Sequence, residues 1–385
     1  MLELAVKGNK WYWGWMIVLL GIIGAGFGLY LMQLKFGLGI TGMSRDVSWG
    51  FYIANFTYLV GVAAGGVMVV LPYYLHDYKA YGKITILGEF LAIASIVMCL
   101  LFIIIDLGQP MRALNVLLYP TPNSVLFYDA IVLNGYLFLN LVIGWNVLES
   151  ERNGVHYQGW LKPLIYISIP WAVSIHTVTA YLYCGLPGRH FWLTAILAPR
   201  FLSSAFAAGP ALLILLCLFI RRYTNFDPGR EQIQSLAKTV AYAISINVFF
   251  FLCEVFVAFY SNIPGHTTHL KYLFAGVHGH GALVPWMWAS MILMAAGIVL
   301  TVTPATRKNE SSLMIACIVI ILGTWIDKGL GMISGGFVPN PMHEVTEYAP
   351  TTPEIGITIG VYAIGALVLT VLYKMAVGVK EEVHG

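Results

Sequence analysis

The sequence predicts an all-α integral membrane protein with about ten transmembrane helices. Of its 385 residues, 59% are hydrophobic and only 10% are charged, whereas charged residues reach about 25% in soluble domains. Apolar runs long enough to cross a hydrocarbon core, which takes about 20 residues, recur along the whole chain. These runs lack a two-residue alternation, so they predict helices rather than the strands of a barrel.

The elements follow from these runs in chain order. The first run comes after Lys7 and Lys10 and imitates a signal peptide, but it exceeds the usual apolar region of one and is therefore predicted to span the membrane. The short connections leave no room for an independent soluble domain, so residues 1–385 form one polytopic domain. The predicted spans are Trp13–Leu34, Trp49–Leu75, Ile84–Ile105, Val125–Leu148, Pro163–Cys184, Ser204–Ile220, Thr239–Tyr260, Ala282–Val302, Leu313–Ile333 and Ile355–Val377.

Weak internal similarity predicts two four-helix bundles, made of spans two to five (49–185) and six to nine (204–333), flanked by spans one and ten. Spans two and six share small-residue clusters, Ala63 to Gly66 and Ala207 to Gly209. Spans five and nine each carry a polar residue, His176 and Asp327, ahead of an exit rich in Gly and Pro. Small residues are also common at helix contacts in lipid, so chance similarity remains an alternative.

The distribution of basic residues predicts the orientation. Most of the 21 Lys and Arg residues fall in segments on the side that the two termini share. The positive-inside rule therefore predicts a protein of the cytoplasmic membrane with both termini in the cytoplasm. The segments after spans three, five, seven and nine would then face outward.

Several polar residues lie inside predicted spans, where a charge costs about 2.5 to 3.5 kcal/mol even on lenient scales. Hydrogen bonds or ion pairs between helices are one explanation, and we favour an ion pair for Asp327 and Lys328. His176 and Glu254 are better explained by chemistry, because both can titrate. Glu89 either opens a proton path or extends to the interface. A predicted proton path comprises Glu89, Glu254 and Asp327.

The cap from Asp106 to Arg112 ends the third span with an acid, a glycine, a proline and a base. One interpretation is a functional polar site at the membrane boundary, and the other is a simple pair of Asp106 with Arg112 that ties spans three and four together. In span five, His176, Thr177, Ala180 and Tyr181 lie on one stripe of the helix. Such a stripe offers hydrogen-bond donors, an apolar wall and a group that can exchange a proton, as a quinone ring requires.

The sequence gives no sign of a resident redox centre. Its five cysteines occur singly in predicted spans without a CxxC motif, which argues against iron–sulfur clusters and covalent haem. His176 alone among the ten histidines lies deep in a predicted span, whereas a b-type haem needs paired axial ligands. We therefore predict no haem, no iron–sulfur cluster and no metal on this chain, and nothing indicates nucleic-acid binding.

An ordered set of motifs resembles the NrfD/PsrC family, the membrane quinone-binding subunits of respiratory complexes such as polysulfide reductase, in its ten-helix branch. The resemblance runs from about Trp49 to Glu354. The motifs are Trp49-Gly50-x-Tyr52-Ile53-Ala54-Asn55-Phe56, Gly61-x-Ala63-Ala64-Gly65-Gly66, the cap from Asp106 to Arg112, Ser174-x-His176-Thr177, Leu197-Ala198-Pro199-Arg200-Phe201, Gly336-Phe337-Val338-Pro339-Asn340-Pro341 and Glu347-Tyr348-x-Pro350-Thr351-x-x-Glu354.

The resemblance implies a subunit that exchanges electrons between menaquinol or menaquinone and a ferredoxin-like iron–sulfur subunit on the outer face. Quinol or quinone oxidoreductase activity would then belong only to the whole complex, with a multihaem cytochrome c and a second membrane subunit as further candidate partners. Sulfur or sulfate metabolism is the expected setting. His176 and Asp106 are the expected catalytic residues, and the implied quinone region comprises Asn55, Tyr58, Asp106, Arg112, Tyr128, Asp129 and His176. A secondary transporter, or an ion- or proton-conducting subunit, is the alternative.

Overall fold

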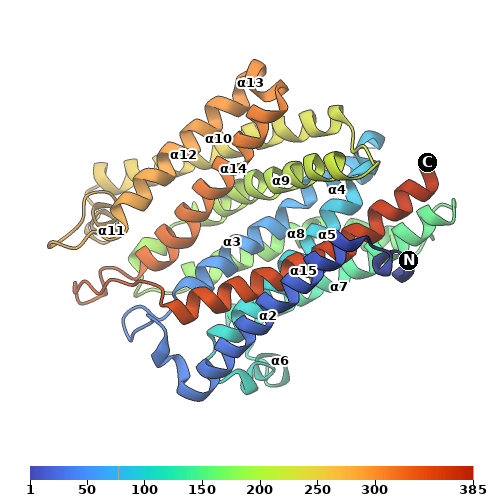
Figure 1. Cartoon of the computed structure of the whole chain (residues 1–385). Helices are drawn as coiled ribbons and strands as arrows, with labels where there is room; N and C mark the ends of the chain where they lie inside the picture. Colours follow the sequence, from blue (N-terminus) through green and yellow to red (C-terminus); the bar gives the residue numbers. More distant parts are fainter. Residues whose placement is uncertain (77, 385) are drawn as a thin grey trace.

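Ten helices long and apolar enough to cross a membrane form the computed structural model, which describes residues 1–76 and 78–384. The prediction of an all-helical protein with ten candidate membrane spans is therefore confirmed. Figure 1 shows the helices running side by side. The spans are α2 (Lys10–Phe36, continued by η1, Gly37–Ile40), α3 with α4 (Phe51–Gly65 and Val67–Leu75), α5 (Thr85–Asp106), α7 (Val125–Arg152), α8 (Leu161–Cys184), α9 (Leu197–Tyr223), α10 (Arg230–Tyr260), α12 (Val284–Val302), α14 with η5 (Glu310–Trp325 and Ile326–Ser334) and α15 (Thr352–His384).

The two ends of this helix bundle differ. Both termini lie at one end, which we call the terminal end (Figure 1). The opposite end, which we call the loop end, carries the segments 37–50, 107–124, 185–196, 261–283 and 335–351. Short helices lie in these connections: α1 (Leu2–Val6), η2 (Lys79–Lys83) and α13 (Pro304–Lys308) at the terminal end, and η3 (Pro110–Arg112), α6 (Asn115–Leu118), η4 (His190–Trp192) and α11 (Pro264–Phe274) at the loop end.

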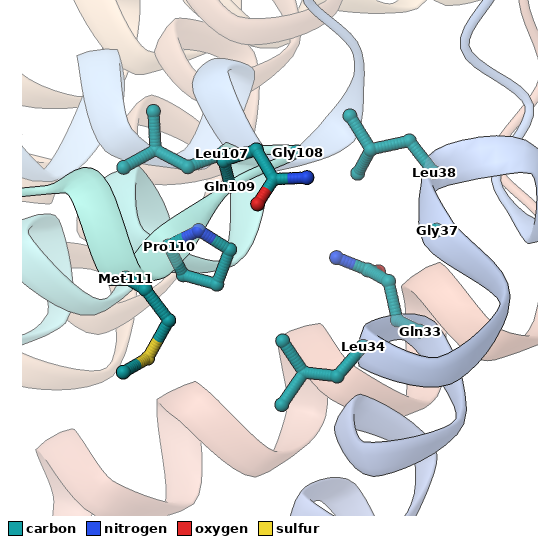
Figure 2. A pocket seen from close by; sticks show the side chains of 9 residues that line it. All are labelled: Gln33, Leu34, Gly37, Leu38, Leu107, Gly108, Gln109, Pro110 and Met111. Carbon is teal, nitrogen blue, oxygen red and sulfur yellow. The ribbon is translucent and has the colours of Figure 1, made fainter.

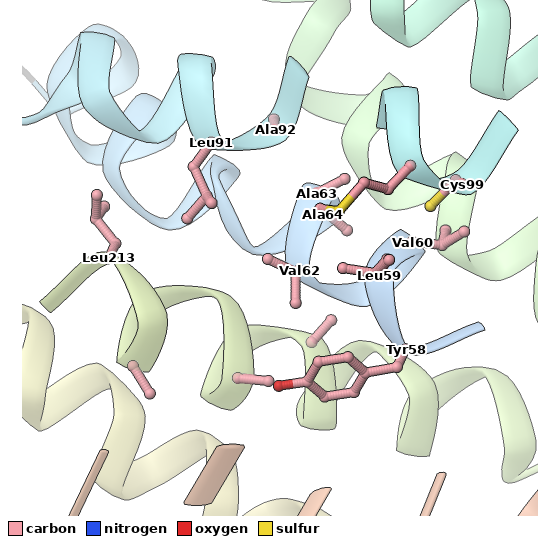
Figure 3. Packing of buried hydrophobic residues seen from close by; sticks show 14 of the residues in the cluster. Tyr58, Leu59, Val60, Val62, Ala63, Ala64, Leu91, Ala92, Cys99 and Leu213 are labelled. Carbon is pink, nitrogen blue, oxygen red and sulfur yellow. The ribbon is translucent and has the colours of Figure 1, made fainter. Parts of the chain in front are cut away.

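Helix α3 is the centre of the molecule. Every residue from Tyr52 to Gly65 is buried, and α3 packs against α5, α8, α9 and η5. Figure 3 shows α3 between α5, which contributes Leu91 and Cys99, and α9. Small side chains let neighbouring helices approach closely without a hydrophobic driving force. Because α3 is enclosed on all sides, it is the common packing partner of α5, α8, α9 and η5.

The remaining spans pack as two groups on either side of α3 and α9. Helices α5, α7 and α8 contact one another in sequence, as do α10, α12 and α14, and α2 packs along α15. At the α2–α15 contact, a Cβ on Gly26 would lie 2.7 Å from the Cα of Gly360. The division of these spans into two four-helix bundles flanked by spans one and ten stays a prediction.

The ninth span changes its winding near the loop end. Helix α14 passes at Ile326 into η5, a π-helix of nine residues that carries Asp327 and Lys328. All nine residues of η5 are buried. Wide π turns are rare and occur frequently at functional sites, because they redirect side chains within an otherwise regular helix.

A segment before the last span closes the loop end. The hydroxyl of Tyr348 accepts a hydrogen bond from the backbone N–H of Phe51 at 2.7 Å and donates one to the carboxylate of Glu354 at 2.7 Å. Glu354 is buried and also accepts from the backbone N–H of Gly42 at 2.7 Å. Through these hydrogen bonds, the start of α15 and the segment just before it are tied to the start of α3 and to Gly42 in the connection between η1 and α3.

Candidate functional site

Asp106 is the last residue of α5, and one of its carboxylate oxygens is buried without a hydrogen-bond partner among the described residues. The chain turns away at Leu107 and enters the 3-10 turn η3 at Pro110. A buried carboxylate oxygen without a partner is costly, so it requires an explanation such as a ligand or a reaction. The predicted polar cap therefore places its acid inward.

A pocket of about 180 Å³ lies beside this cap, between α2 and the segment after Asp106. Figure 2 shows Gln33, Leu34 and Leu38 across an open space from Pro110 and Met111. Gln33 was not predicted from the sequence. Its side chain is buried, donates to the carbonyl of Ile105 at 2.6 Å and accepts from the hydroxyl of Tyr52 at 2.8 Å.

Tyr58 and Asn55 lie on the buried helix α3 but differ in their partners. The hydroxyl of Tyr58 is buried and has no hydrogen-bond partner within the described residues. The side-chain oxygen of Asn55 accepts from Trp325 at 3.0 Å and from Tyr362 at 2.8 Å. Asn55 thus ties α3 to α14 and α15, while the hydroxyl of Tyr58 lies buried beside a small cavity that Thr324 also lines.

One face of α8 brings together His176, Thr179 and Tyr183, because positions three and four apart share a helix face. Thr179 donates to the buried carboxylate of Asp129 on α7 at 2.7 Å. The hydroxyl of Tyr183 forms a hydrogen bond with that of Thr57 on α3. This face lines the interior of the first group of helices with polar side chains.

Two residues of the predicted quinone region lie elsewhere. Arg112 is exposed at the end of η3, and no ion pair joins it to Asp106 in the described parts of the chain. Tyr128 on α7 is 46% exposed, on the outside of the helix bundle. The structure thus does not bring these two side chains to the buried polar residues, and the simple tie between spans three and four is not present.

His176 is fully buried and lies where the two groups of helices meet. Its ring stacks on Phe201 of α9, with centroids 5.0 Å apart. Its Nε2 contacts Nζ of Lys328 in η5, whereas its Nδ1 is buried without a partner among the described residues. The polar residues of spans five and nine, whose placement suggested a repeat, therefore meet in space.

Lys328 makes four contacts with three residues. Besides His176, its Nζ donates to the hydroxyl of Ser204 at 3.0 Å and to the carbonyl of Phe201 at 3.4 Å. It also lies 4.4 Å from the centroid of the Phe201 ring, which favours a cation. Its side chain is buried to 3% exposure.

Arg200 joins the two remaining charges of this region. It donates two hydrogen bonds to Asp327, at 2.7 and 2.8 Å, and a further one to Glu254 on α10. The side chains of Arg200 and Asp327 are each 4% exposed. The structure makes Arg200 the centre of a buried ion-pair network. We call Arg200, Glu254, Asp327, Lys328 and His176 the interbundle network.

Glu89 lies apart from this network. It is buried near the start of α5, toward the terminal end, and its Oε2 has no hydrogen-bond partner in the described structure. No hydrogen bond links it to Glu254 or Asp327 in residues 1–76 and 78–384. A proton path through these three residues stays a prediction.

No metal-binding group appears in the described ranges. Within those ranges, the structure has no cluster of three or more His, Cys, Asp or Glu side chains that could hold an ion. The five cysteines are free thiols.

The sequence is similar to known membrane subunits of reductases. The family described as "Polysulphide reductase, NrfD" matches residues 39–338. A putative dimethyl sulfoxide reductase membrane subunit of Halobacterium salinarum is 25% identical, covering 92% of this chain and 89% of its own length. A selenate reductase subunit of Mesobacillus selenatarsenatis is 24% identical, covering 96% and 94%.

A third relative, the menaquinone reductase integral membrane subunit of Nitratidesulfovibrio vulgaris, is 20% identical, covering 91% of this chain and 88% of its own length. These relatives match nearly the whole chain. With ten membrane-length helices in the described part of the chain and a family match across 39–338, this multi-pass membrane protein belongs to the NrfD polysulphide reductase family.

Proposed function

We propose that this chain is the quinol-exchanging membrane subunit of a respiratory oxidoreductase complex. It takes menaquinol into the first group of helices near the loop end and passes its electrons to an iron–sulfur partner outside the membrane. Two relatives are named menaquinone reductase integral membrane subunit and Hdr-like menaquinol oxidoreductase integral membrane subunit. The family match over 39–338 supports the same role for the present chain.

One observation supports the site itself. Three buried polar atoms without a partner in the described structure belong to residues of the predicted quinone region: a carboxylate oxygen of Asp106, the hydroxyl of Tyr58 and Nδ1 of His176. Buried polar groups are normally hydrogen-bonded, and each exception requires an explanation, of which a ligand or a catalytic role is one. A quinol offers hydroxyl donors, and a quinone offers carbonyl acceptors, which are the partners such groups require.

The pocket at the cap supports lateral entry. It is lined by apolar side chains of α2, by the turn after Asp106 and by Gln33. A quinol carries an apolar tail and a polar ring, so an opening of mixed character at the membrane boundary suits its transfer from lipid. Asp129 completes the proposed polar interior, and Asn55, Arg112 and Tyr128 stay predicted members of the region.

The finer assignments belong to the same proposal. We place the loop end on the outer face, with an iron–sulfur subunit over it and both termini in the cytoplasm. Sulfate respiration and the DsrP branch of the DsrMKJOP complex stay our sequence-based prediction. The names of the relatives point to dimethyl sulfoxide, selenate and menaquinone reductases, so they favour the family role without selecting a branch.

The test replaces Asp106 by Asn, which keeps the size of the side chain and removes its capacity to take a proton. The complex is purified with its partner subunits, its bound menaquinone is extracted and quantified, and oxidation of menadiol by an electron-accepting dye is followed. The matched control is Glu149→Gln, a carboxylate exposed on α7.

We expect Asp106→Asn to assemble normally and to lose about 10²- to 10⁴-fold in turnover, the usual contribution of a positioned proton acceptor. Glu149→Gln should match the wild type. A wild-type complex that contains no menaquinone and does not oxidise menadiol would overturn the proposed function.

A further inference from the structure

We infer that Lys328 is the proton partner of His176, so that a proton taken from quinol at Nδ1 of His176 is matched by transfer of the Nε2 proton to Nζ of Lys328. This inference rests on the proposed function and adds a residue from the second group of helices to the reaction. Its basis is the contact between Nζ and Nε2 and the remaining neighbours of both groups.

The surroundings of Nζ accommodate a full ammonium. An ammonium has three N–H donors and no acceptor, and Nζ has three acceptors around it: Nε2 of His176, the hydroxyl of Ser204 and the carbonyl of Phe201. The face of the Phe201 ring adds a fourth, weaker contact suited to a cation. In this state Nε2 of His176 is an acceptor, and its ring carries its proton on Nδ1.

The same heavy-atom positions also accommodate a state with one proton fewer. A neutral amine donates to Ser204 and to the Phe201 carbonyl and accepts from Nε2–H of His176. In that state Nδ1 of His176 is a bare acceptor, and it is the atom that has no partner among the described residues. The two states interconvert by proton movement alone, without rearrangement of the buried side chains.

The charges of the interbundle network favour proton uptake. Arg200 is paired with two carboxylates, Glu254 and Asp327, which leaves one negative charge when all three are ionised. A neutral Lys328 leaves that charge uncompensated in a buried site, whereas an ammonium brings the network to zero. Uncompensated buried charge is strongly unfavourable, so the network attracts one proton to Lys328.

The proposed step moves one proton and no electron. The O–H bond of the quinol breaks as Nδ1–H of His176 forms, and Nε2–H breaks as a third N–H forms on Lys328. The product is a quinol anion next to a neutral His176 and an ammonium. The two electrons of the quinol anion leave for the iron–sulfur partner, and its remaining proton is released as the anion becomes quinone.

Gly61 keeps this contact possible. A Cβ on Gly61 would lie 3.1 Å from Nζ of Lys328 and 3.3 Å from Nε2 of His176. Both distances are tighter than ordinary contacts, so a side chain there would crowd the pair. The absence of a side chain at this position on α3 leaves the lysine and the histidine in direct contact.

The test uses the whole purified complex and three substitutions. Lys328→Met keeps an unbranched side chain but has no amine that can gain or lose a proton. Lys328→Gln keeps hydrogen-bonding capacity but cannot transfer a proton, and Lys328→Ala leaves space for an added amine. Lys162→Met, at an exposed lysine on α8, is the matched control. Each complex is assayed for its retained subunits, bound menaquinone and menadiol oxidation, the last with and without a series of primary alkylamines of different pKa.

We expect the three Lys328 variants to keep their subunits and bound menaquinone while losing about 10²- to 10⁴-fold in turnover. Alkylamines should restore turnover to Lys328→Ala with a rate that follows the pKa of the amine, since proton transfer obeys such a relation. A purely structural lysine would give no such dependence.

Two results would overturn the inference and leave the proposed function standing. The first is wild-type turnover in an assembled Lys328→Gln or Lys328→Met complex. The second is rescue of Lys328→Ala that is equal for all amines. If Lys328→Met does not assemble, the Lys328→Gln and amine measurements still decide the matter, and failure of menadiol oxidation by the wild type would instead refute the proposed function.

Discussion

Gly65 of α3 and Gly209 of α9 touch backbone to backbone. A Cβ on Gly65 would lie 2.7 Å from the Cα of Gly209, and one on Gly209 would lie 2.8 Å from the Cα of Gly65. These two glycines belong to the small-residue clusters that suggested a repeat in the sequence. The close crossing of the two central helices therefore depends on the absence of two side chains.

Gly65→Ala should lower the stability of the complex. The new methyl group meets backbone on the facing helix, including the carbonyl oxygen of Ala205 at 2.8 Å, and backbone cannot move aside as a flexible side chain can. Overpacking of this kind costs about 1 to 3 kcal/mol. Thermal unfolding in detergent measures it. Gly21→Ala is the control, because its added methyl group would have no atom within 4 Å; an equal effect at both sites would contradict the close-crossing explanation.

Arg200→Met should destabilise the protein strongly. It leaves Asp327, which is nearly inaccessible, and Glu254 without their shared cation, and breaking a buried pair typically costs about 3 to 5 kcal/mol. Adding Asp327→Asn and Glu254→Gln should recover part of this loss, since the uncompensated charges are then gone. Unfolding by SDS titration in mixed micelles gives the free energies of unfolding.

Arg222→Met is the matched control for Arg200→Met, because Arg222 lies on the same helix and is exposed. Its effect should stay within about 0.5 kcal/mol. If the triple variant were less stable than Arg200→Met alone, the explanation by uncompensated charge would be wrong.

The apolar runs predicted the number and order of the helices well, because burial in lipid demands long apolar segments. They predicted the helix ends less well, because a helix continues past the membrane where residues turn polar. The seventh span was predicted from Thr239, and its helix begins at Arg230. The sixth was predicted from Ser204, and its helix begins at Leu197, with Pro199 tolerated in the first turn.

The candidate site was predicted only in part. Asp106, Asp129 and His176 stood out as polar residues in apolar surroundings, and all three have buried polar atoms. The partner of Lys328 was not predictable, because neighbours in sequence do not face each other on a helix: Asp327 points to Arg200, and Lys328 points to His176. Gln33 was missed because a neutral residue near the end of a span gives no signal in composition.

Tyr348→Phe should loosen the loop end without removing any segment. The lost hydroxyl leaves the N–H of Phe51 and the carboxylate of Glu354 each short of one partner, and an unsatisfied buried group costs about 1 to 3 kcal/mol. Faster amide hydrogen exchange in residues 42–51 is the expected result. Tyr362→Phe, which removes a bond to Asn55 instead, is the control, and equal exchange in 42–51 for both variants would contradict the assigned role.

Met342→Asp should weaken retention of the proposed outer partner without altering stability. Met342 is 79% exposed at the loop end, so an acid there changes only the surface. Deleting the loop-end segment that contains Met342 would also remove Tyr348, so a loss of docking could not be distinguished from a loss of folding. Co-purification of subunits at increasing salt measures retention, and Val155→Asp, 59% exposed at the terminal end, is the control. Undiminished retention in Met342→Asp would exclude this residue from the docking surface.

His269 should make the loop end sensitive to mild acid. Its Nδ1 donates to the carbonyl of Gly335 at 3.3 Å, and it joins α11 to the end of η5. Burial lowers the pKa of His269 from 6.5 to about 4. The unfolded segment therefore binds a proton below pH 6.5 that the folded one excludes, so stability is complete above pH 6.5 and falls as the pH drops toward 4.

The loss is at most about 3 kcal/mol, from 1.36 kcal/mol per pKa unit. His266 acts in the same direction, because burial and the nearby His190 lower its pKa. Glu347 lies 3.4 Å from His280. Burial alone would raise the pKa of Glu347, but hydrogen bonds donated by the backbone N–H of Ala282 and the hydroxyl of Tyr272 outweigh burial and lower that pKa. The contribution of Glu347 to stability is lost only below pH 4.5, the pKa of an unfolded glutamate. Any loss of stability between pH 6.5 and pH 4.5 therefore comes from the histidines.

Amide hydrogen exchange in residues 261–283, corrected for the intrinsic pH dependence of exchange, measures this effect in the purified complex at pH 7.5 and pH 5. Protection should fall at pH 5 in the wild type and fall much less in His269→Gln, whose amide can still donate to the Gly335 carbonyl but takes no proton. His156→Gln, in the connection between α7 and α8 at the terminal end, should behave as the wild type. Equal losses in the wild type and His269→Gln would assign the acid sensitivity to another group.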